Sequence, residues 1–532
     1  MKKAFLPYEQ TGYFSKVIID YLKGAAELES FYNLPPQISS IPEIIEQKKS
    51  DQPDREVVCS ALLKQHAKLF SEKNLPAVRS NIESLRFPHT FTVTTAHQPS
   101  LFLGPLYVIY KTVSVIVMAE KLNAEYPQHH FVPVFWMGSE DHDKEELNNI
   151  HLFGKNFVWN TAQQGAFGRM SPSSLRPWVN EIKEKLGDSP AAKELSEALD
   201  DAYVREKTIG TATRKFLYHF FEEDGLVIVD GDDAELKKLF IPVLEKEIRE
   251  QFSFHSLTRS NEKFAIHYEP QITPREINLF YLDEGIRERI VKDGNQFMVL
   301  NTSVSFSQEE IEKLIHSSPE KFSPNVALRP VYQETVLPDV VVVGGGAEVT
   351  YWLQLKIMFD ELKKPLPIVM LRNSVLWIDQ AYSMRMEKLN IKPEELFHST
   401  HDLINHFIEK ETGNQFSLKE EIRRVVSAFD DAVQRTMLID QSLKGSFESE
   451  KIRVVKTLEQ LEDRLLKAAK RKDETSVNQI RIMREKLFPE NKLQERYDNF
   501  MMLYSKHGKN FIDELKLNLD PFEQKFTVLI EE

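Results

Sequence analysis

The densest group of chemically versatile side chains in the 532-residue sequence lies at Trp136 to Asp143, which reads WMGSEDHD. Glu140, Asp141, His142 and Asp143 place three carboxylates and an imidazole in four consecutive positions. Carboxylates this close repel one another unless a cation, an ammonium group or ordered donors compensate them, so the cluster is costly for a purely structural segment. It predicts a general base, in which Asp141 polarises His142 and His142 removes a proton from an attacking amine.

Two other interpretations of this cluster stay open. A divalent metal accepts Glu, Asp and His ligands, but the sequence has no HExxH motif and no distant histidine pair with ligand spacing, so we predict no metal site. The purely structural interpretation is an acidic helix N-terminus that Asp141 or Asp143 caps.

A second group follows a β-rich run in TTAHQPSLFLGPLYVIYK, residues 94–111. Here a strand ends at His97 and Gln98, and Gly104 and Pro105 open a helix, because proline is favoured at the first helical position. The free N–H groups and positive dipole end of that helix predict an anion site, with His97 and Gln98 as donors to a phosphate or carboxylate. The context is similar to the His-containing loop with which class I aminoacyl-tRNA synthetases and nucleotidylyltransferases hold ATP phosphates. The alternative is a core histidine that caps its own loop.

Three cationic side chains near these segments are predicted to bind substrate anions. Lys111 lies six residues after Pro105, roughly 9 Å along the helix axis at 1.5 Å per residue, where it either leans back toward the anion or extends to solvent. Arg329 precedes a proline that holds it extended, and its guanidinium suits a carboxylate, with Gln333 on the next turn; a structural salt bridge is equally compatible. Arg372 ends a β-rich run and is the other candidate for a substrate carboxylate.

The glycine-rich segment VVVVGGGAEVTYW, residues 340–352, fails the common nucleotide motifs. No Gly-Lys-Ser/Thr follows it, which excludes a Walker A loop. Val349 stands where the third glycine or alanine of a dinucleotide fingerprint belongs, so NAD is disfavoured. Gly344 to Gly346 predict either a close backbone approach to another ligand, with Glu348 and Tyr351 behind it, or a plain tight turn.

The elements that position these groups follow from β-rich runs that alternate with helical segments from Phe91 onward. This alternation is typical of a parallel sheet in an α/β fold, whose ligand crevice lies beyond the carboxyl ends of the strands. The runs are FTVTTA at 91–96, FVPVFWMG at 131–138, GLVIVDGD at 225–232, VVVVGGG at 340–346 and PIVMLR at 367–372.

These runs predict an α/β core at 91–410, with an N-terminal helical segment at 1–90 packed on it. A small antiparallel insertion at about 275–302 is expected to act as a lid or a structural flap. After residue 410 glycine and proline nearly vanish, which predicts a helical coiled-coil arm at 411–490 and a C-terminal segment at 491–532 that returns to the core.

The predicted arm has an apolar seam and a polar tip. Leu458, Leu461, Leu465 and Ala468 step by three and four residues, as in a coiled coil. The polar stretch Lys470 to Thr475 is the predicted tip.

Composition narrows the function classes. The net charge of -13 argues against nonspecific nucleic-acid binding but leaves room for a local basic pocket that binds a small anion. The N-terminus lacks a continuous apolar run and a cleavage site, and no 18-residue charge-free apolar stretch occurs, so we predict a cytoplasmic protein without membrane contact. The single cysteine, Cys59, excludes an intramolecular disulfide and is predicted to be a small buried hydrophobe rather than a nucleophile.

Four of these segments together point to one family. HQPSLFLGPLYVIYK, WMGSEDHD, LRPVYQE and GGGAEVTYW occur in the order and spacing of the cysteine-adding enzymes of bacillithiol synthesis, and the chain resembles this cysteine ligase family. The likeness covers nearly the whole chain, including LQERYDNFMMLYSKHGKNF near its end. It implies a Rossmann-like core that carries a helical coiled-coil domain, a homodimer formed through the coiled coil, and a ligase that joins cysteine to the amine of glucosaminyl-malate to make bacillithiol.

The family's motifs carry over to named positions of this sequence. The first motif falls on His97, Gln98, Gly104, Pro105, Tyr107 and Lys111, the acidic motif on Glu140, Asp141, His142 and Asp143, and the glycine motif on Gly344, Gly345, Gly346, Glu348 and Tyr351. Leu103 departs from a common threonine, and Gly345 with Gly346 from a more usual Gly-Pro. Because the His, Gln and carboxylates are kept, we expect the same reaction class.

The implied reaction adds expectations about cofactors and roles. Amide formation from a free carboxylate needs activation, most simply by ATP, with Mg²⁺ as its companion, although no complete nucleotide signature is present. We expect His97, Gln98 and the helix after Pro105 to hold a phosphate or malate group, while Asp141 and His142 orient and deprotonate the amine. Two alternatives stay open: a nucleotidylyltransferase or synthetase-like enzyme that acts on another small metabolite, and a noncatalytic scaffold built on the coiled coil.

Overall fold

The computed structural model describes residues 1–413 and 417–532, which form two compact units. The larger unit, called the core below, consists of Phe5–Val375 and Glu495–Thr527. The smaller unit, called the arm unit, consists of Met1–Ala4, Leu376–Gln494 and Val528–Glu532. The domain boundaries proposed after residues 90, 410 and 490 stay predictions. No helix in the described ranges is long and apolar enough to cross a membrane.

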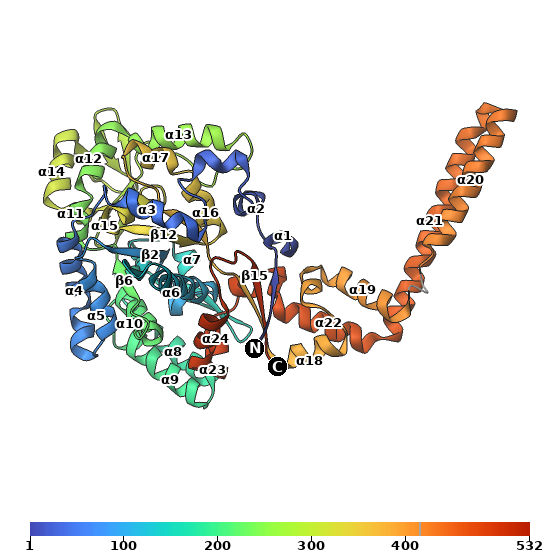
Figure 1. Ribbon diagram of the computed structural model, residues 1–532, viewed down its shortest axis with the longest axis horizontal. Coiled ribbons are helices and arrows are strands. Elements are labelled where there is room, and N and C mark those ends of the chain that lie inside the picture. The colour runs from blue at the N-terminus through green and yellow to red at the C-terminus, as the bar shows by residue number, and fades with distance from the viewer. Residues whose placement is uncertain (414–416) are drawn as a thin grey trace. The chain divides into compact units, whose positions relative to one another are not determined.

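A five-stranded parallel sheet forms the centre of the core (Figure 1). Its strands have the order β13-β12-β2-β3-β6. All five strands coincide with the β-rich runs of the sequence, so the predicted parallel α/β core is confirmed. Nearly every strand residue is buried, as expected for a sheet that is covered on both faces. The strands are β2 Thr90–His97, β3 His130–Met137, β6 Val227–Asp230, β12 Asp339–Gly344 and β13 Ile368–Leu371.

The registers of these strands bring their carboxyl ends to one edge of the sheet. His97 pairs with Met137, Met137 pairs with Asp230, and Gly344 pairs with Leu371. Ligands of open α/β sheets bind beyond this edge. The loops after β2, β3 and β12, which carry the polar clusters of the sequence, therefore meet there.

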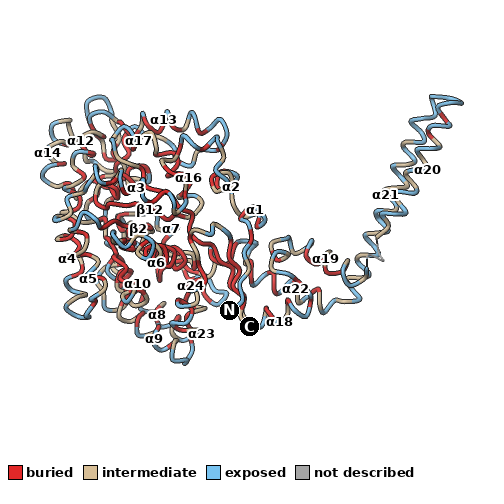
Figure 2. Tube along the Cα trace, in the orientation of Figure 1, coloured by how far each residue is buried: buried red, intermediate tan, exposed pale blue. Residues whose placement is uncertain are grey.

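Buried helices cover the sheet. The helix α6, Tyr107–Glu125, packs against β2 and β3 and is buried along most of its length. The helix α3, Ile41–Lys48, packs against β12, and α16, Gly346–Leu353, follows β12 directly. Figure 2 shows the sheet and α6 in the red of buried residues, with paler helices around them. The helix that carries Lys111 is thus an interior element of the core.

Shorter elements complete the core. A two-stranded hairpin pairs β4, Asn149–Leu152, with β5, Lys155–Val158. The other core helices are α1 Tyr8–Thr11, α2 Lys16–Leu22, α4 Arg55–Glu72, α5 Pro76–Ser84, α7 Lys144–Leu147, α8 Arg176–Leu186, α9 Pro190–Leu199, α10 Ile209–Phe221, α11 Ala234–Leu239, α12 Ile241–Glu250, α13 Phe252–Phe264, α14 Gln308–Ser317, α15 Arg329–Val336, α17 Lys356–Glu361, α23 Met501–His507 and α24 Lys509–Asn518.

An antiparallel sheet of five strands forms the insertion, in the order β10-β9-β8-β7-β11. It extends beyond the hairpins expected at about 275–302, because β11 returns to pair with β7, with Phe322 opposite Tyr281. This return brings β8 and the chain after β11 to the pocket described below. The strands are β7 Leu279–Asp283, β8 Ile286–Asp293, β9 Gln296–Val299, β10 Ser305–Ser307 and β11 Phe322–Pro324.

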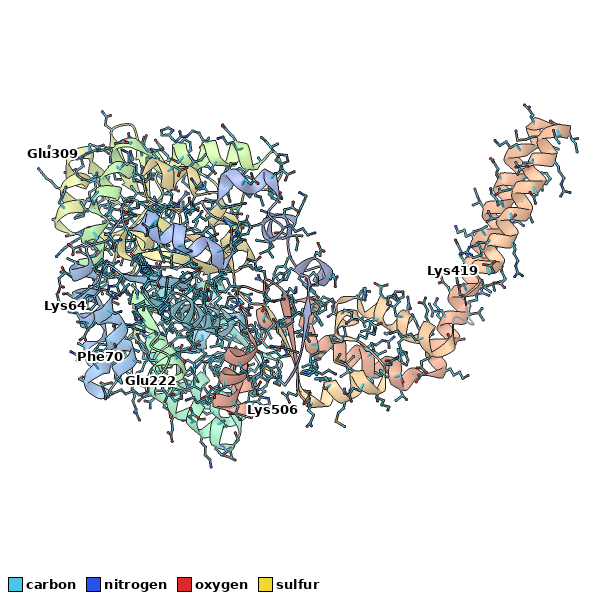
Figure 3. All side chains as sticks on the ribbon, in the orientation of Figure 1. Lys64, Phe70, Glu222, Glu309, Lys419 and Lys506 are labelled. Carbon is cyan, nitrogen blue, oxygen red and sulfur yellow. The ribbon has the colours of Figure 1, made fainter. Side chains whose placement is uncertain are left out.

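The arm unit combines helices with most of the residues of a small sheet. Two of the helices, α20 and α21, lie side by side as a hairpin, and Lys419 in Figure 3 marks the start of α20. This hairpin confirms the predicted helical coiled-coil arm. The sheet has the order β1-β15-β14, with β1 Lys2–Leu6, β14 Val375–Ile378 and β15 Phe526–Ile530, and the helices are α18 Gln380–Lys388, α19 Thr400–Thr412, α20 Lys419–Ile439, α21 Lys444–Lys472 and α22 Glu474–Leu487.

The prediction that Lys470 to Thr475 forms the tip of the arm is wrong. The chain reverses between α20 and α21, where the Asp440 side chain accepts a hydrogen bond from the Ser442 amide at 2.9 Å. Lys470 lies inside α21, because lysine and arginine favour helix. Asp473 separates α21 from α22 as an N-cap rather than as a hairpin turn.

The predicted seam of the arm is only partly covered. Leu458 is half-buried, whereas Leu461 and Leu465 keep 42% and 43% of their surface exposed. No residue of α21 is buried, although α22 buries Ile480 and Met483. The hairpin therefore leaves apolar surface uncovered along α21.

Candidate functional site

A pocket lies beyond the carboxyl edge of the parallel sheet, and all residues of its wall belong to the core. The loops after β2 and β3, the start of α16, strand β8 and the chain after Gln494 contribute to this wall. The sequence-predicted residues that the structure brings together here are His97, Gln98, Tyr107, Glu140, Asp141, Arg329, Gly345, Gly346, Glu348, Tyr351 and Arg372. Those outside the wall are Gly104, Pro105, Lys111, His142, Asp143, Gln333 and Gly344.

Two arginines of the wall, Arg287 and Arg496, were missed by sequence reasoning. Arg496 lies in the LQERYDNF segment that carries part of the family resemblance, so a signal for it existed. Arg287 belongs to a strand of alternating charged residues, where nothing in the sequence sets it apart. Only the return of the insertion to the sheet edge brings it to the pocket.

His97 ends β2 and is a neutral group of the pocket wall. Its ring meets the Tyr107 ring edge-on at 5.4 Å between centroids, and its Nε2 lies 3.5 Å from the Ser100 hydroxyl. Burial, and then the nearby Lys111 ammonium, lower the pKa of His97 to about 3. The imidazole therefore offers hydrogen bonds to a ligand at neutral pH without carrying a positive charge.

The loop between His97 and α6 is held in a strained conformation. Phe102, Leu103 and Gly104 all have positive φ, at 51°, 65° and 61°, which costs energy for the two residues with side chains. The Tyr203 hydroxyl accepts from the Phe102 amide at 2.9 Å, and the Asn499 side-chain amide donates to the carbonyls of Phe102 and Gly104 at 3.0 and 2.6 Å. A side chain at position 104 would meet the Ser100 Cβ at 2.9 Å. Glycine is therefore needed at this position, although it does not touch the pocket.

The helix predicted to bind an anion at its N-terminus begins later than expected, and the residues directly before it lie outside the pocket wall. The helix α6 begins at Tyr107, two residues after Pro105, and the Leu106 amide already donates to the Asp498 carbonyl at 2.8 Å. Gly104 and Pro105 lie outside the pocket wall. The helix contributes the Tyr107 side chain to the pocket instead.

Lys111 fixes a carboxylate in the pocket rather than binding a ligand. Its buried ammonium donates to the Ala96 carbonyl and to Glu348 Oε2, both at 2.6 Å. Glu348 Oε2 also accepts from the Gly345 amide at 2.8 Å. Burial alone would raise the pKa of Glu348, but the Lys111 ammonium and the Gly345 amide together outweigh burial, so the pKa is lowered. A side chain at Gly344 would come within 2.8 Å of the Glu348 Cβ, which explains a glycine at the end of β12.

Arg372 supplies a cationic group to the pocket wall. Its two terminal nitrogens donate to the Glu495 carboxylate at 3.0 and 2.7 Å, and both side chains are buried. The third nitrogen, Nε, is buried and has no hydrogen-bond partner in the part of the chain that the structure describes. The guanidinium groups of Arg372 and Arg496 lie 5.2 and 5.8 Å from the centre of the Tyr107 ring. These guanidinium groups suit a carboxylate or a phosphate.

Arg329 is another cation of the pocket wall, and the Gln333 side chain supports it from outside the pocket. Arg329 donates to the Gln333 side-chain oxygen at 2.8 Å and to the Tyr351 hydroxyl at 3.3 Å. Gln333 is buried outside the pocket and donates to the Asp339 carboxylate at 2.7 Å. The structure thus makes Gln333 a support for Arg329.

Glu140 is the most deeply held carboxylate of the acidic cluster. Lys237, which is fully buried, donates to Glu140 Oε1 and to the Phe322 carbonyl. Burial raises the pKa of the Glu140 carboxyl to about 7, while Lys237 lowers it and Asp232 raises it in smaller measure. A pocket carboxyl that titrates near neutrality is suited to proton transfer.

The side chains of Asp141 and His142 are not hydrogen-bonded to each other, because His142 Nδ1 lies 3.9 Å from Asp141 Oδ1. Asp141 Oδ1 accepts from the His142 backbone amide at 2.7 Å, and Oδ2 accepts from the Gln98 side chain at 3.2 Å. The His142 ring instead accepts a hydrogen bond at Nδ1 from Arg287 at 2.6 Å. Asp143 caps α7 by accepting from the Glu146 amide, as the structural interpretation of the cluster predicted.

The pocket wall therefore carries both cationic and acidic groups. The cations are Arg287, Arg329, Arg372 and Arg496, and the carboxylates are Glu140, Asp141 and Glu348. His97 and Gln98 lie at the end of the central strand as neutral polar groups. Such a wall can bind a molecule or a pair of molecules that presents both an anion and an ammonium group.

Comparison with known proteins places both parts of the chain in one family. Residues 1–373 match the family model described as bacillithiol biosynthesis BshC, N-terminal Rossmann-like domain. Residues 375–531 match the model described as bacillithiol biosynthesis BshC, C-terminal coiled-coil domain. The two models together account for almost the full length.

Relatives and one solved structure complete the comparison. Proteins named "Putative cysteine ligase BshC" from Flavobacterium psychrophilum and Cytophaga hutchinsonii are 39% and 40% identical to the chain, over 98% and 96% of it and 98% and 95% of their own lengths. A structure described as "putative arginyl t-RNA synthetase" from Campylobacter jejuni covers 83% of this chain and 96% of its own, at 9% identity and a TM-score of 0.23. That score is too low to bear on fold or function.

Proposed function

The chain belongs to the BshC family of bacillithiol biosynthesis, and we propose that it is a ligase that joins L-cysteine to the amine of glucosaminyl-malate in the last step of that pathway. The bond formed is an amide between the cysteine carboxyl carbon and the glucosamine nitrogen. One observation carries the proposal: the wall of a single pocket of the core carries both guanidinium groups and carboxylates. Both substrates carry carboxylate and ammonium groups, so such a pocket can orient them together.

The arginines of the pocket wall are proposed to bind the malate group. Among the described residues the Arg372 Nε–H has no hydrogen-bond partner, and Arg329 and Arg496 belong to the same wall. Guanidinium groups bind carboxylates with directed, charge-assisted hydrogen bonds. Glu348, held ionised by Lys111, would bind an ammonium group.

Activation of the cysteine carboxylate is proposed to require ATP. ATP supplies a phosphate or nucleotide leaving group on the carboxyl carbon, and Mg²⁺ would accompany it. The amides of Gly346 and Ala347 at the start of α16, together with Arg372 Nε, are compatible with an anionic phosphate. His97 and Gln98 would donate hydrogen bonds to the same group.

Mass spectrometry of products tests the proposal directly. The purified protein is incubated with cysteine and glucosaminyl-malate, with and without Mg-ATP. We expect the mass of bacillithiol to appear only when ATP is present. Pyrophosphate release with other acids but no bacillithiol would instead favour the synthetase-like alternative, and no turnover with any acid would favour a noncatalytic scaffold.

The arm is proposed to make the protein a homodimer. The hairpin exposes Leu438 and Ile439 at 88% and 85% of their surface, in addition to Leu461 and Leu465. Apolar side chains in this number are costly to leave in water, and a second copy of the hairpin would cover them. Sedimentation of the purified chain tests this proposal.

A further inference from the structure

We infer that Glu140 is the catalytic residue that takes the proton from the attacking ammonium group, and that Lys237 is the residue that positions it. The inference rests on the proposed amide-forming function. It gives Glu140 the role for which the sequence had suggested Asp141 and His142.

The orientation of Glu140 is the first support. Oε1 is held by the Lys237 ammonium, which is itself fixed by the Phe322 carbonyl. Oε2 has no hydrogen-bond partner in the described part of the chain, and the side chain keeps 11% of its surface exposed on the pocket wall. One oxygen is therefore anchored while the other is open to a ligand.

His142 is placed unfavourably for this role. Its Nδ1 lone pair already accepts from Arg287 at 2.6 Å, so the ring proton is on Nε2. A second proton would have to enter at Nδ1, which would break this bond and set two cations side by side. The ring also lies outside the pocket wall.

The other pocket groups are committed to different states. Burial, and then the Lys111 ammonium, keep the pKa of His97 at about 3, which makes it a weak base. Glu348 Oε2 is bonded to Lys111 and to the Gly345 amide, and its lowered pKa favours a permanent anion. Asp141 uses one oxygen for the His142 amide and the other for Gln98. The two environments push the pKa values of Glu140 and Glu348 apart. Such a separation is typical of active sites in which one carboxyl group exchanges a proton and the other stays ionised.

The surroundings of Glu140 set the pH range in which it can act. Burial raises its pKa to about 7, against the attraction of Lys237. Below that pH the carboxyl is protonated and cannot accept a proton, so the rate should rise as pH increases through about 7. The other charged or titratable groups that face it are Asp232 after β6, Arg287 on β8, Arg169 and Tyr332.

The step itself is a simple proton transfer. One N–H bond of the glucosamine ammonium breaks and an O–H bond to Glu140 Oε2 forms, while the N–H electron pair stays on nitrogen as the lone pair. The neutral amine then forms the C–N bond to the activated cysteine carboxyl carbon. The C–O bond to the activating phosphate or nucleotide breaks with its electron pair on the leaving oxygen, and the second N–H proton passes to that leaving group or to solvent. Lys237 remains an ammonium throughout and keeps the carboxyl group aimed at the pocket.

The test compares product formation and substrate binding in four full-length proteins. These are the wild type, Glu140→Gln, Glu140→Asp, and the control Glu145→Gln, which removes an exposed carboxylate from the same loop region. Rates are measured by mass spectrometry from pH 5.5 to 9, and the affinity for glucosaminyl-malate by calorimetry. Because general bases contribute about 10²–10⁴-fold, we expect Glu140→Gln to lower kcat about 100-fold or more with less than about a threefold change in affinity. Glu140→Asp should recover part of the rate, and Glu145→Gln should match the wild type.

The variant Lys237→Met provides the readout for positioning. Loss of the ammonium should move the rise of the rate with pH to higher pH, because Lys237 lowers the pKa of Glu140. If Glu140→Gln fails to fold beside an unpaired Lys237, the double variant Glu140→Gln/Lys237→Met removes both charges and should still be inactive. His142→Ala should keep the wild-type position of the pH limb.

Each remaining outcome overturns the assignment in a distinguishable way. A folded Glu140→Gln that keeps its rate within about fivefold, or an unchanged kcat with a raised KM, would show that Glu140 binds rather than removes a proton. If the rise of the rate with pH disappeared only in His142→Ala, His142 and not Glu140 would be the general base. A wild-type protein that forms no amide with any donor would overturn the proposed function itself, and the base assignment with it.

Discussion

The core contains fully buried ion pairs, whereas the ion pairs within the described α20–α21 hairpin are exposed or half-buried. In the core, Arg372 and Glu495 are exposed to only 2% and 1%, and Lys48 and Glu334 to 1% and 0%. In the arm, Lys451 and Asp430 keep 25% and 53% of their side chains exposed. A buried charge that loses its partner is costly, whereas an exposed pair contributes little. Charges therefore fix geometry in the core and are expected to matter mainly for solubility in the arm.

Apolar residues also differ in burial between the core and the arm. The described strands of the central sheet are buried almost throughout, while α21 has no buried residue. An apolar side chain in the core is thus satisfied by its own chain. On α21 no side chain is buried, and we therefore propose chemistry for the core and assembly for the arm.

The largest expected effect comes from breaking a buried pair. Glu495→Gln leaves the Arg372 charge without compensation and also weakens the bond from the Val375 amide. We expect a loss of about 3–5 kcal/mol in the free energy of unfolding of the core. The matched arm variant Asp430→Asn should cost less than about 1 kcal/mol. Urea denaturation followed by tryptophan fluorescence compares them, and equal costs would contradict the distinction.

The next effect concerns the exposed stripe of the arm. Leu461→Glu/Leu465→Glu puts charges where we propose a second hairpin to dock. Sedimentation should then show half the wild-type mass, with core melting unchanged. Lys456→Glu, at an exposed position of the same helix, is the control and should stay dimeric. A monomeric wild type would refute the proposed dimer.

A smaller effect is predicted for the pH dependence of core stability. His66 is buried, and burial followed by the nearby Arg214 charge lowers its pKa to about 3 from an ordinary 6.5. Between these values the unfolded chain binds the proton and the native chain does not, so the free energy of unfolding should fall as pH decreases from 6.5 toward 3. His66→Gln should reduce that slope in urea titrations at pH 7, 5 and 4. An unchanged slope would show that His66 is not the group responsible.

Helix caps should show the smallest effect and no difference between the regions. Asp54 caps α4 in the core by accepting from the Val57 amide, and Asp473 caps α22 in the arm unit by accepting from the Ser476 amide. Alanine at either position should cost about 1 kcal/mol, because a cap acts locally and near solvent. Thermal melting of the two variants measures this. If the alanine variant of the core cap lost several times more unfolding free energy than that of the arm cap, the unit in which a residue lies, and not its burial, would determine the cost of a substitution.

Much of the core could be predicted because local patterns decide it. The five apolar runs specify buried strands, and their carboxyl ends bring His97, Asp141 and Gly345 together without further information. Asp143 as a cap also follows from its place before a short helix. These features depend on neighbours in the sequence.

The rest depends on contacts between distant segments. Arg287 reaches His142 across 145 positions, and Glu495 reaches Arg372 across 123. The hydrophobic periodicity of a sequence does not predict contacts between distant polar residues. The contacts of His142 with Arg287 and of Lys111 with Glu348 could therefore not be predicted. The hairpin turn at Asp440 was missed by sequence reasoning. The residues around Asp440 and those around the expected tip at Lys470 have similar helix propensities, so propensity alone does not show where the chain reverses.

The division between a chemical core and an assembling arm can be tested in one measurement. Amide formation by equal amounts of subunit is followed by mass spectrometry for the wild type, Glu348→Gln and Leu461→Glu/Leu465→Glu. We predict that the pocket variant loses at least about 30-fold in rate, because an ammonium group loses its fixed counter-charge, while the arm variant stays within about twofold. A folded arm variant that loses as much activity as Glu348→Gln would contradict the account.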